Sequence, residues 1–422
     1  MMSNTTSNKS DIFAYLIPFV VLLYTFSLIW GWFPLSHTIY VLFLGVLVCI
    51  IECNRYVKSK AFVALVILEI VLGLKMFMNA PLHASTNGYL YEMLSICITA
   101  MMGYFLLRSK DEKLVKGMVY MIMIILLVNA IGSSVVETIL PGSIRACVTE
   151  FHTTGSQELA KSFYKYGMAS YELTHAIPTI IPILVFGIKT VHNYRLKLLF
   201  ISVLAACLIL CFLGGSTTVL ILGVLGLIIS MLTRPQKGKG QLIIFALFSF
   251  VFLLIMNNDA LVLSLLERID DLIGNEGPFH SKILDFEDSV MYDETSEGVG
   301  GRLALYTMSI DAIISNPFFG TNSDIIGHHS TLLDHWACLG LVGFIPFVVF
   351  IYKHIKESSH LLSENSRYFY IEGVVLAILI LSVKSIDGWE SWLFLFVVLP
   401  LFARYIDSIS HVDSNNSKTI KR

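Results

Sequence analysis

Residues 114–136, LVKGMVYMIMIILLVNAIGSSVV, form an almost unbroken apolar stretch that decides the class of fold. A stretch of about 20 mostly apolar residues can cross the hydrocarbon core of a bilayer as a helix. Further windows of this kind lie at 12–30, 37–53, 61–79, 88–107, 174–190, 196–213, 216–232, 241–257, 330–352, 368–386 and 388–405. The sequence therefore predicts an all-α integral membrane protein with about 12 transmembrane helices.

The composition of the chain supports this class. Of the 422 residues, 55% are hydrophobic and 14% are charged, and the mean hydropathy is +0.74. Soluble domains carry roughly 25% charged residues. No basic tract suggests a nucleic-acid partner. The polar residues 1–11 lack the charged segment and cleavage site of a signal peptide, so we expect the first apolar window to be retained.

The distribution of basic residues predicts how the chain is threaded through the membrane. Lysine and arginine concentrate in alternate loops, at 54–60, 108–116, 189–197, 234–239 and 353–367, and in the C-terminal tail. Such loops usually face the cytoplasm. The remaining loops hold few basic residues, which are Arg145, Lys161, Lys165, Arg268, Lys282 and Arg302. Both termini are therefore predicted to be cytoplasmic.

This threading divides the chain into three parts. Residues 1–257 would contain the first nine transmembrane helices and an outer loop at about 137–173. Residues 258–329 would form a large, partly helical outer loop between helices 9 and 10. Residues 330–422 would contain the last three helices and a cytoplasmic tail. Long loops on a helical scaffold often carry the function.

The end of the large outer loop offers a cation at the start of a helix. Apolar residues at helical spacing follow Gly300-Gly301-Arg302, and Asn316-Pro317 ends the pattern. Free N–H groups at a helix N-terminus bind phosphate, glycine lets the backbone approach closely, and arginine grips phosphate oxygens with a planar fork. The alternative is an ordinary surface arginine beside turn glycines.

A histidine stands at the mouth of the tenth window. His329 titrates near neutrality, which suits a general base. If His329 lies on the helix, its face holds four further residues, which are Leu333, Trp336, Gly340 and Gly343. The two glycines would allow another helix to pack closely. The alternative is an interfacial histidine beside a well-packed helix, and His328 and His335 compete for the same role.

Other polar residues stand near the same predicted surface or inside the spans. Arg145 is a cationic candidate in the first outer loop, as are His152 and Lys161. Glu172 and His175 lie three apart, side by side on a helix, where they could bind sugar hydroxyls. Glu69, Lys75 and Glu92 fall inside predicted spans, where charges are costly. Lys75 and Lys384 are close enough to helix ends to extend toward water.

These residues resemble the O-antigen ligase and polymerase family. His329-Ser330, nine residues, Gly340, two residues and Gly343 is similar to the family pattern His-[Asn/Ser/Gln]-x9-Gly-x2-[Gly/Thr/Tyr]. The run Gly301-Arg302-Leu303 … Tyr306 … Asn316-Pro317 … Gly320 resembles the stretch that precedes that pattern. The layout of about 12 helices with the large loop between the ninth and tenth is also similar.

The resemblance implies a metal-independent glycosyltransferase without cofactors in the bacterial inner membrane. It would join repeat units carried on undecaprenyl diphosphate, as donor and acceptor, on the periplasmic face. By matching position, Arg302 would hold the donor diphosphate, and His329 would activate the acceptor hydroxyl or orient the diphosphate. Tyr306 and His328 then join the candidates for substrate binding, and a chain-length regulator protein is a candidate partner.

The sequence departs from the family pattern at one point and leaves rival functions open. Many members carry an arginine after a serine at the outer start of the eighth span, but here the run is Gly214-Gly215-Ser216-Thr217-Thr218. Arg145 could supply this second diphosphate contact. We expect an O-antigen polymerase. One alternative is a ligase that moves finished glycan onto lipid A core. The other is a flippase for lipid-linked oligosaccharides, and the charges within the spans slightly favour the flippase.

Overall fold

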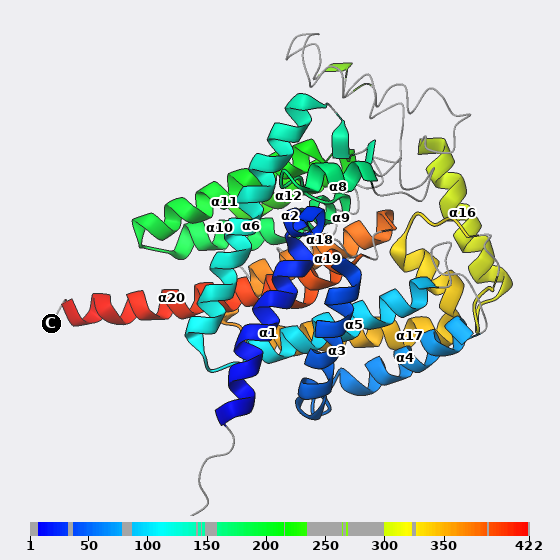
Figure 1. Ribbon diagram of the computed structural model, residues 1–422, viewed down its shortest axis with the longest axis horizontal. Helices are drawn as coiled ribbons and strands as arrows, with labels where there is room; N and C mark the ends of the chain where they lie inside the picture. Colours follow the sequence, from blue (N-terminus) through cyan, green and yellow to red (C-terminus); the bar gives the residue numbers. More distant parts are fainter. Residues whose placement is uncertain are drawn as a thin grey trace, which may run out of the picture.

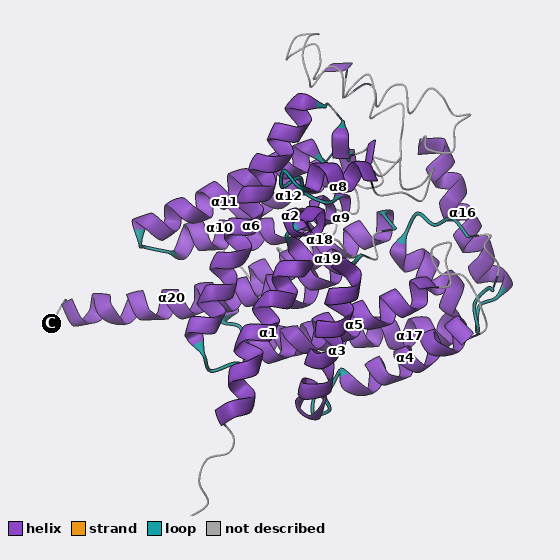
Figure 2. Cartoon of the chain, viewed as in Figure 1, coloured by secondary structure: helices purple, strands orange, loops and turns teal. Residues whose placement is uncertain are grey.

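The described part of the chain is entirely helical outside its turns. The computed structural model describes residues 7–32, 37–77, 87–140, 142–144, 146–147, 158–214, 216–233, 264, 267–268, 299–322, 326–385 and 388–420. Within these ranges every regular secondary-structure element is a helix (Figure 2). The prediction of an all-α protein is confirmed for this part of the chain.

The helices follow one another along the chain with short turns between most of them. Their bounds are α1 Ser7–Thr25, α2 Ser27–Trp32, α3 His37–Tyr56, α4 Phe62–Phe77, α5 Asn87–Arg108, α6 Glu112–Ile139, α8 Glu158–Tyr164, α9 Tyr171–Ala176, η1 Ile177–Ile180, α10 Ile181–Thr190, α11 Tyr194–Leu213, α12 Thr217–Leu232, α16 Val299–Ser315, α17 Thr331–His360, α18 Glu364–Val383, α19 Trp389–Leu393, η3 Phe394–Val398 and α20 Leu399–Ile420.

Several of these helices can cross a membrane. Within the described ranges, 7 helices or helix runs are long and apolar enough, and they are Ile39–Tyr56, Glu112–Ile139, Tyr171–Thr190, Tyr194–Leu213, Thr331–His360, Glu364–Val383 and Trp389–Ser410. The chain is therefore a multi-pass membrane protein. Each predicted window except 241–257 coincides with described helices, and 241–257 lies outside the described residues. The count of about 12 spans stays a prediction.

The helices pack in two groups that share a centre. In Figure 1, α3, α4, α5 and α17 lie in the lower part of the molecule, and α10, α11 and α12 lie in the upper part. Helix α18 contacts both groups, through α17 on one side and α10 and α12 on the other. The runs α9–η1–α10 and α19–η3–α20 are the most enclosed, with 83% and 72% of their most apolar windows buried.

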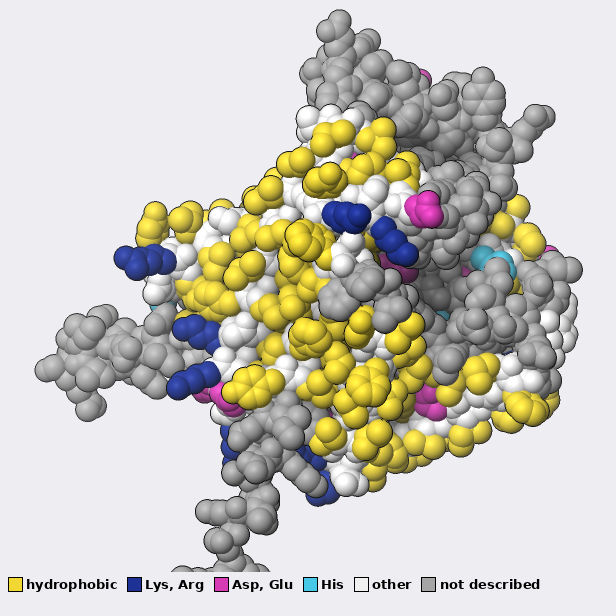
Figure 3. Space-filling model, viewed as in Figure 1, with side chains coloured by type: hydrophobic (Ala, Val, Ile, Leu, Met, Phe, Trp, Pro, Cys, Tyr) yellow, Lys and Arg dark blue, Asp and Glu magenta, His cyan; other side chains and the backbone are white. Residues whose placement is uncertain are grey.

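The turns predicted to be cytoplasmic gather at one end of the bundle. The Arg404 guanidinium donates to the carbonyl oxygens of Leu106 and Ser109, and the Lys189 ammonium donates to the Ser230 carbonyl at 2.7 Å. Figure 3 shows most lysine and arginine side chains of this face along its left and lower margins, with two more beside α8, and a broad apolar surface between. This arrangement agrees with the predicted alternation of loops.

Helix α17 is interrupted at Gly340, where φ is 59° and ψ is −175°. The short segment after α16 fills the interruption, because it supplies partners for the backbone groups that the break releases. Three hydrogen bonds join the two segments, from Thr321 N–H to the Ala337 carbonyl (2.8 Å), from Leu341 N–H to the Pro317 carbonyl (2.8 Å) and from Val342 N–H to the Phe318 carbonyl (3.1 Å).

Two glycines make this junction possible. Gly320 also has a positive φ of 69°, and it lies backbone to backbone with Gly340. A Cβ atom on Gly340 would overlap the backbone of Phe318 and Gly320, and one on Gly320 would overlap the carbonyl of Cys338. The conformation at Gly340 is also one that residues with a side chain rarely adopt. The junction therefore requires glycine on both sides.

We expect Gly340→Ala to lower stability by more than about 2 kcal/mol, because it adds backbone strain and a steric clash. Thermal unfolding of the detergent-purified protein measures this loss. The control is Gly117→Ala, because a Cβ at Gly117 of α6 would meet nothing within 4 Å. An unchanged midpoint for Gly340→Ala would contradict the proposed role of the junction.

Candidate functional site

Helix α16 carries Arg302 and Tyr306 toward the end of the bundle opposite the basic turns. Its bounds, Val299–Ser315, agree with the predicted start at Gly300-Gly301-Arg302 and the predicted end before Asn316-Pro317. Arg302 is in the first turn of the helix, and its side chain lies outside the described residues. Tyr306 follows four residues later, and residues at this spacing share one face of a helix.

Tyr306 lies against His329. Their ring centroids are 5.7 Å apart, with the rings tilted by 54°. The Tyr306 hydroxyl donates a hydrogen bond of 3.0 Å to the carbonyl of Val383 at the end of α18. Tyr306 thus connects three elements, and it fixes the histidine beside the face of α16 that begins with Arg302.

The start of α17 is fixed to the same end of α18. The backbone N–H and the hydroxyl of Thr331 each donate to the carbonyl of Lys384 at 3.0 Å. Ser330 caps the helix, since its side chain accepts from Leu333 N–H at 3.2 Å. His329 therefore precedes a firmly anchored helix start.

The structure corrects two expectations about this segment. His329 lies before the N-cap, so it does not share a helical face with Leu333 or Trp336. Gly340 breaks α17 and contacts the segment after α16, whereas Gly343 packs against a helix as predicted, with Val71 of α4 2.8 Å from an added Cβ. The break could not be predicted from the glycine pattern, which suits close helix packing equally well.

His328 holds an unusual backbone conformation. Its φ of +49° is the one positive value for a residue other than glycine among the described residues. Histidine adopts this left-handed region more often than most residues, although it still costs free energy. The conformation turns the chain sharply just before His329. Strained backbone of this kind is common at functional sites.

A buried aspartate that the sequence analysis did not select ties these parts together. Asp334 accepts from Ser330 N–H at 3.0 Å and from the Ser309 hydroxyl at 2.7 Å. The Ser309 oxygen in turn accepts from Gly327 N–H at 2.9 Å. Asp334, Ser309 and Ser330 are all at most 1% exposed. The aspartate therefore fixes the loop with both histidines to α16 and α17 at once.

Below this layer, α17 is joined to α5 by a buried pair. His335 Nδ1 lies 2.6 Å from the Thr331 carbonyl, and His335 Nε2 lies 3.2 Å from a Glu92 carboxyl oxygen. The carbonyl can only accept, so Nδ1 carries a proton. One further proton must lie between Nε2 and the carboxyl group. The pair is therefore neutral overall, which suits its position inside the membrane.

Two lysines expected to extend toward water are buried instead. Lys75 is 6% exposed, and its ammonium donates to Asn322 Oδ1 at 2.9 Å and to the Thr321 carbonyl at 3.3 Å. It therefore holds the segment that fills the break in α17. Lys384 is 9% exposed, and its carbonyl accepts the two hydrogen bonds from Thr331. A hydrophobicity pattern shows where a charge falls along a span but not which partner it meets there.

The residues predicted from the first outer loop are only partly described. Glu172 and His175 lie on α9, as predicted, and His175 is fully buried with Nδ1 2.9 Å from the Tyr171 carbonyl. Glu172 hydrogen-bonds to Glu390 of α19, which also accepts from the Ser170 hydroxyl at 3.0 Å. Arg145 and His152 lie outside the described residues.

The described residues hold no group of three or more histidine, cysteine, aspartate or glutamate side chains arranged to bind a metal ion. The arrangement offers a helix start with an arginine, a histidine from the loop before α17 that packs on Tyr306 one turn further along α16, and buried hydrogen bonds that keep both elements in place. Such a site can bind an anionic group and accept a proton beside it.

Part of the chain is similar to a known family. Residues 200–348 match a family model described as O-antigen ligase. Over this segment, about a third of its length, the chain is similar to the O-antigen ligase family. The matched segment runs from α11 into α17 and contains α16, His328 and His329. Members of the family are glycosyl-transferring enzymes. No curated protein matches the chain significantly.

Sequence reasoning missed Asp334, Ser309 and Thr331, although one signal was available. Ser330 with an acidic residue shortly after it resembles a capping box, which marks a helix start and places His329 outside the helix. The Glu92–His335 pair also had a signal, because ionisable residues within spans usually pair with one another. The hydrogen bond from Ser309 has no such signal, because it depends on how α16 crosses α17.

We expect Asp334→Ala to lower stability by about 2–4 kcal/mol, since it leaves the buried Ser309 hydroxyl and Ser330 N–H without their acceptor. Thermal unfolding in detergent measures the loss. The control is Asp311→Ala, because Asp311 is an exposed carboxylate on α16, the helix that Asp334 anchors. Equal unfolding midpoints for the two variants would contradict the proposed anchoring role of Asp334.

Proposed function

We propose that this protein is an O-antigen polymerase, which joins undecaprenyl-diphosphate-linked repeat units into a polysaccharide. One observation carries the proposal. The family segment contains a helix that begins with Gly300-Gly301-Arg302 and, one turn later, holds His329 through Tyr306. A cation and a base on adjoining elements suit a reaction between a diphosphate-linked sugar and a hydroxyl group.

The proposed reaction uses the leaving group that the lipid already provides. The acceptor hydroxyl oxygen attacks the anomeric carbon of the donor sugar, and the bond from that carbon to the diphosphate oxygen breaks. The diphosphate lipid leaves with the negative charge, which Arg302 and the N–H groups at the start of α16 stabilise. His329 accepts the hydroxyl proton, and no metal or cofactor takes part in the proposed step.

The remaining candidate residues are assigned to substrate binding. Tyr306 orients His329 and lines the donor side, and the left-handed backbone of His328 turns the chain toward the acceptor. Glu172 of α9 is proposed to contact sugar hydroxyls, whereas His175, which is fully buried, is proposed to support α9 behind it. Arg145 is proposed as the second cation on the diphosphate, because the start of α12 lacks one.

The basic turns also indicate how the enzyme is oriented in its membrane. Basic turns gather at the end of the bundle opposite His329, and such turns usually face the cytoplasm. We therefore place both termini in the cytoplasm, the chain in the bacterial inner membrane, and the His329 site and residues 258–329 on the periplasmic side. A chain-length regulator is a candidate partner at that side.

A deletion strain separates this proposal from the ligase alternative. Loss of the polymerase leaves single repeat units attached to lipid A core, whereas loss of the ligase leaves the core without repeats. A flippase defect would instead trap lipid-linked units at the cytoplasmic face. A core devoid of repeats in the deletion strain would replace the polymerase proposal with the ligase.

In that deletion strain, we expect Arg302→Ala and His329→Ala to abolish the ladder of long glycans, because each removes a group needed for the transfer step. Gel separation of the lipopolysaccharide measures chain length. The controls are Arg195→Ala and His192→Ala, which change exposed residues in the first turn of α11 and on the loop before it. Full ladders from either site variant, at normal abundance in the membrane, would refute the proposed roles.

A further inference from the structure

A cavity at the basic end of the bundle has features of a ligand site. Its volume is about 600 Å³, and it lies where α3 and α5 end and α6 begins. The residues that line it are Glu52, Arg55, Lys58, Tyr104, Phe105, Arg108, Ser109, Lys110, Asp111 and Leu114. This cavity is at the other end of α17 from His329, so the proposed glycosyl transfer does not use it.

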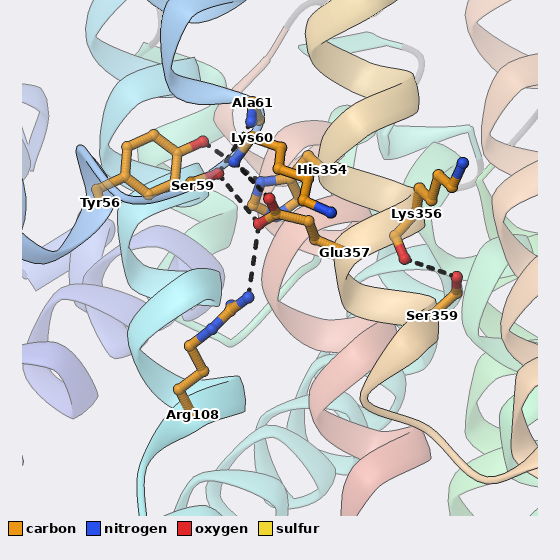
Figure 4. Close-up of polar contacts among 9 residues, drawn as sticks. All are labelled: Tyr56, Ser59, Lys60, Ala61, Arg108, His354, Lys356, Glu357 and Ser359. Carbon is orange, nitrogen blue, oxygen red and sulfur yellow. Dashed lines mark hydrogen bonds and ion pairs between the residues drawn. The ribbon is translucent and has the colours of Figure 1, made fainter.

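The wall of the cavity formed by Arg108 is held in place. Figure 4 shows Glu357 of α17 between Arg108 and the turn after α3. The Glu357 carboxylate lies 3.5 Å from Arg108 Nη2 and accepts from the Ser59 hydroxyl at 3.1 Å and from the Lys60 N–H. The guanidinium also lies 3.7 Å from the centre of the Tyr104 ring. A cation supported on both sides is a prearranged contact for an anion.

Two lysines give the cavity an excess of positive charge. Arg55 is paired with Glu52 at 3.3 Å, and Arg108 with Glu357 at 3.5 Å. Asp111 also lines the cavity and caps α6 by accepting from the N–H groups of Lys113 and Leu114, so the lining holds four cations against two carboxylates. Within the described residues, Lys58 and Lys110 have no ion pair or hydrogen bond from their side chains. They suit one phosphodiester group.

Glu52 indicates that the ligand also carries a hydrogen-bond donor. Its side chain is 2% exposed, and one oxygen faces Arg55. The other oxygen, Oε2, is buried and has no hydrogen-bond partner among the described residues. A buried acceptor without a partner is costly, and a donor on a ligand in the cavity would remove that cost. The ligand should therefore carry a hydrogen-bond donor as well as a phosphate.

The surroundings favour a lipid as the source of this group. Helix α3 exposes an apolar stripe that leads away from the cavity along one face, formed by Ile39, Phe43, Val46 and Ile50 at 39–66% exposure. An apolar face of this kind on a membrane helix contacts acyl chains. Basic cavities where membrane helices end are also places where phospholipid headgroups bind.

We propose that this cavity binds the phosphoethanolamine headgroup of a membrane phospholipid. The phosphate lies between Lys58, Lys110 and Arg108, the ammonium group donates to Glu52, and an acyl chain follows the stripe on α3. The site is independent of the proposed glycosyl transfer. By occupying the gap between the ends of α3, α5 and α6, the lipid stabilises the bundle.

Phosphatidylethanolamine and phosphatidylcholine provide a sharp comparison, because they share the phosphodiester but the choline nitrogen has no N–H. Delipidated full-length protein in detergent is titrated with each lipid, and the unfolding midpoint reports binding. We expect phosphatidylethanolamine to bind about tenfold more tightly, which a hydrogen bond to a charged group can provide. Equal binding of the two lipids would overturn the assignment of the ammonium to Glu52.

Variants and the free headgroup test the other parts of the proposal. Glu52→Gln should remove most of the preference for phosphatidylethanolamine, and Lys58→Ala/Lys110→Ala should weaken binding of both lipids about fivefold or more. The matched control, Arg195→Ala/Lys197→Ala, removes two exposed charges from the basic start of α11 and should bind as the wild type does. Unchanged binding by the double lysine variant would refute the phosphate contact. An equal rise in the unfolding midpoint with soluble phosphoethanolamine would refute a lipid as the source of the headgroup.

Discussion

The backbone contact between Gly320 and Gly340 is the constraint on which the rest of the site depends. It allows the segment after α16 to enter the break in α17, where three backbone hydrogen bonds fix it. Because α16 is thereby attached to α17, the face of α16 with Tyr306 lies against His329. Two helices that are joined only by a loop in the sequence become one rigid unit.

Buried polar groups then fix this unit within an apolar bundle. Asp334 connects the loop to α16, Glu92 and His335 connect α17 to α5, and Lys75 connects α4 to the segment in the break. Each of these four side chains has a hydrogen-bonding partner, because an isolated charge inside a membrane is costly. The same groups keep the proposed site rigid while the surface of the protein remains compatible with lipid.

The parts of the fold that depend on local pattern could be predicted from the sequence. Apolar length predicted the helices, and apolar spacing with Asn316-Pro317 predicted both ends of α16. The break at Gly340 and the burial of Lys75 could not be predicted, because both depend on partners distant in sequence. The placement of His329 before the cap was missed because its spacing to the glycines fits a helix equally well. The contact of His329 with Tyr306 likewise depends on how α16 crosses the start of α17.

The central claim is that Arg302 and His329 act on one bound diphosphate-linked substrate. A double-mutant cycle with Arg302→Lys and His329→Gln tests it most directly, using the purified protein, a lipid-linked repeat unit and the initial rate of glycan transfer. Residues that act together in one transition state lose rate non-additively. We expect the double variant to be little slower than the slower single variant. Two losses that multiply in the double variant would contradict a shared site.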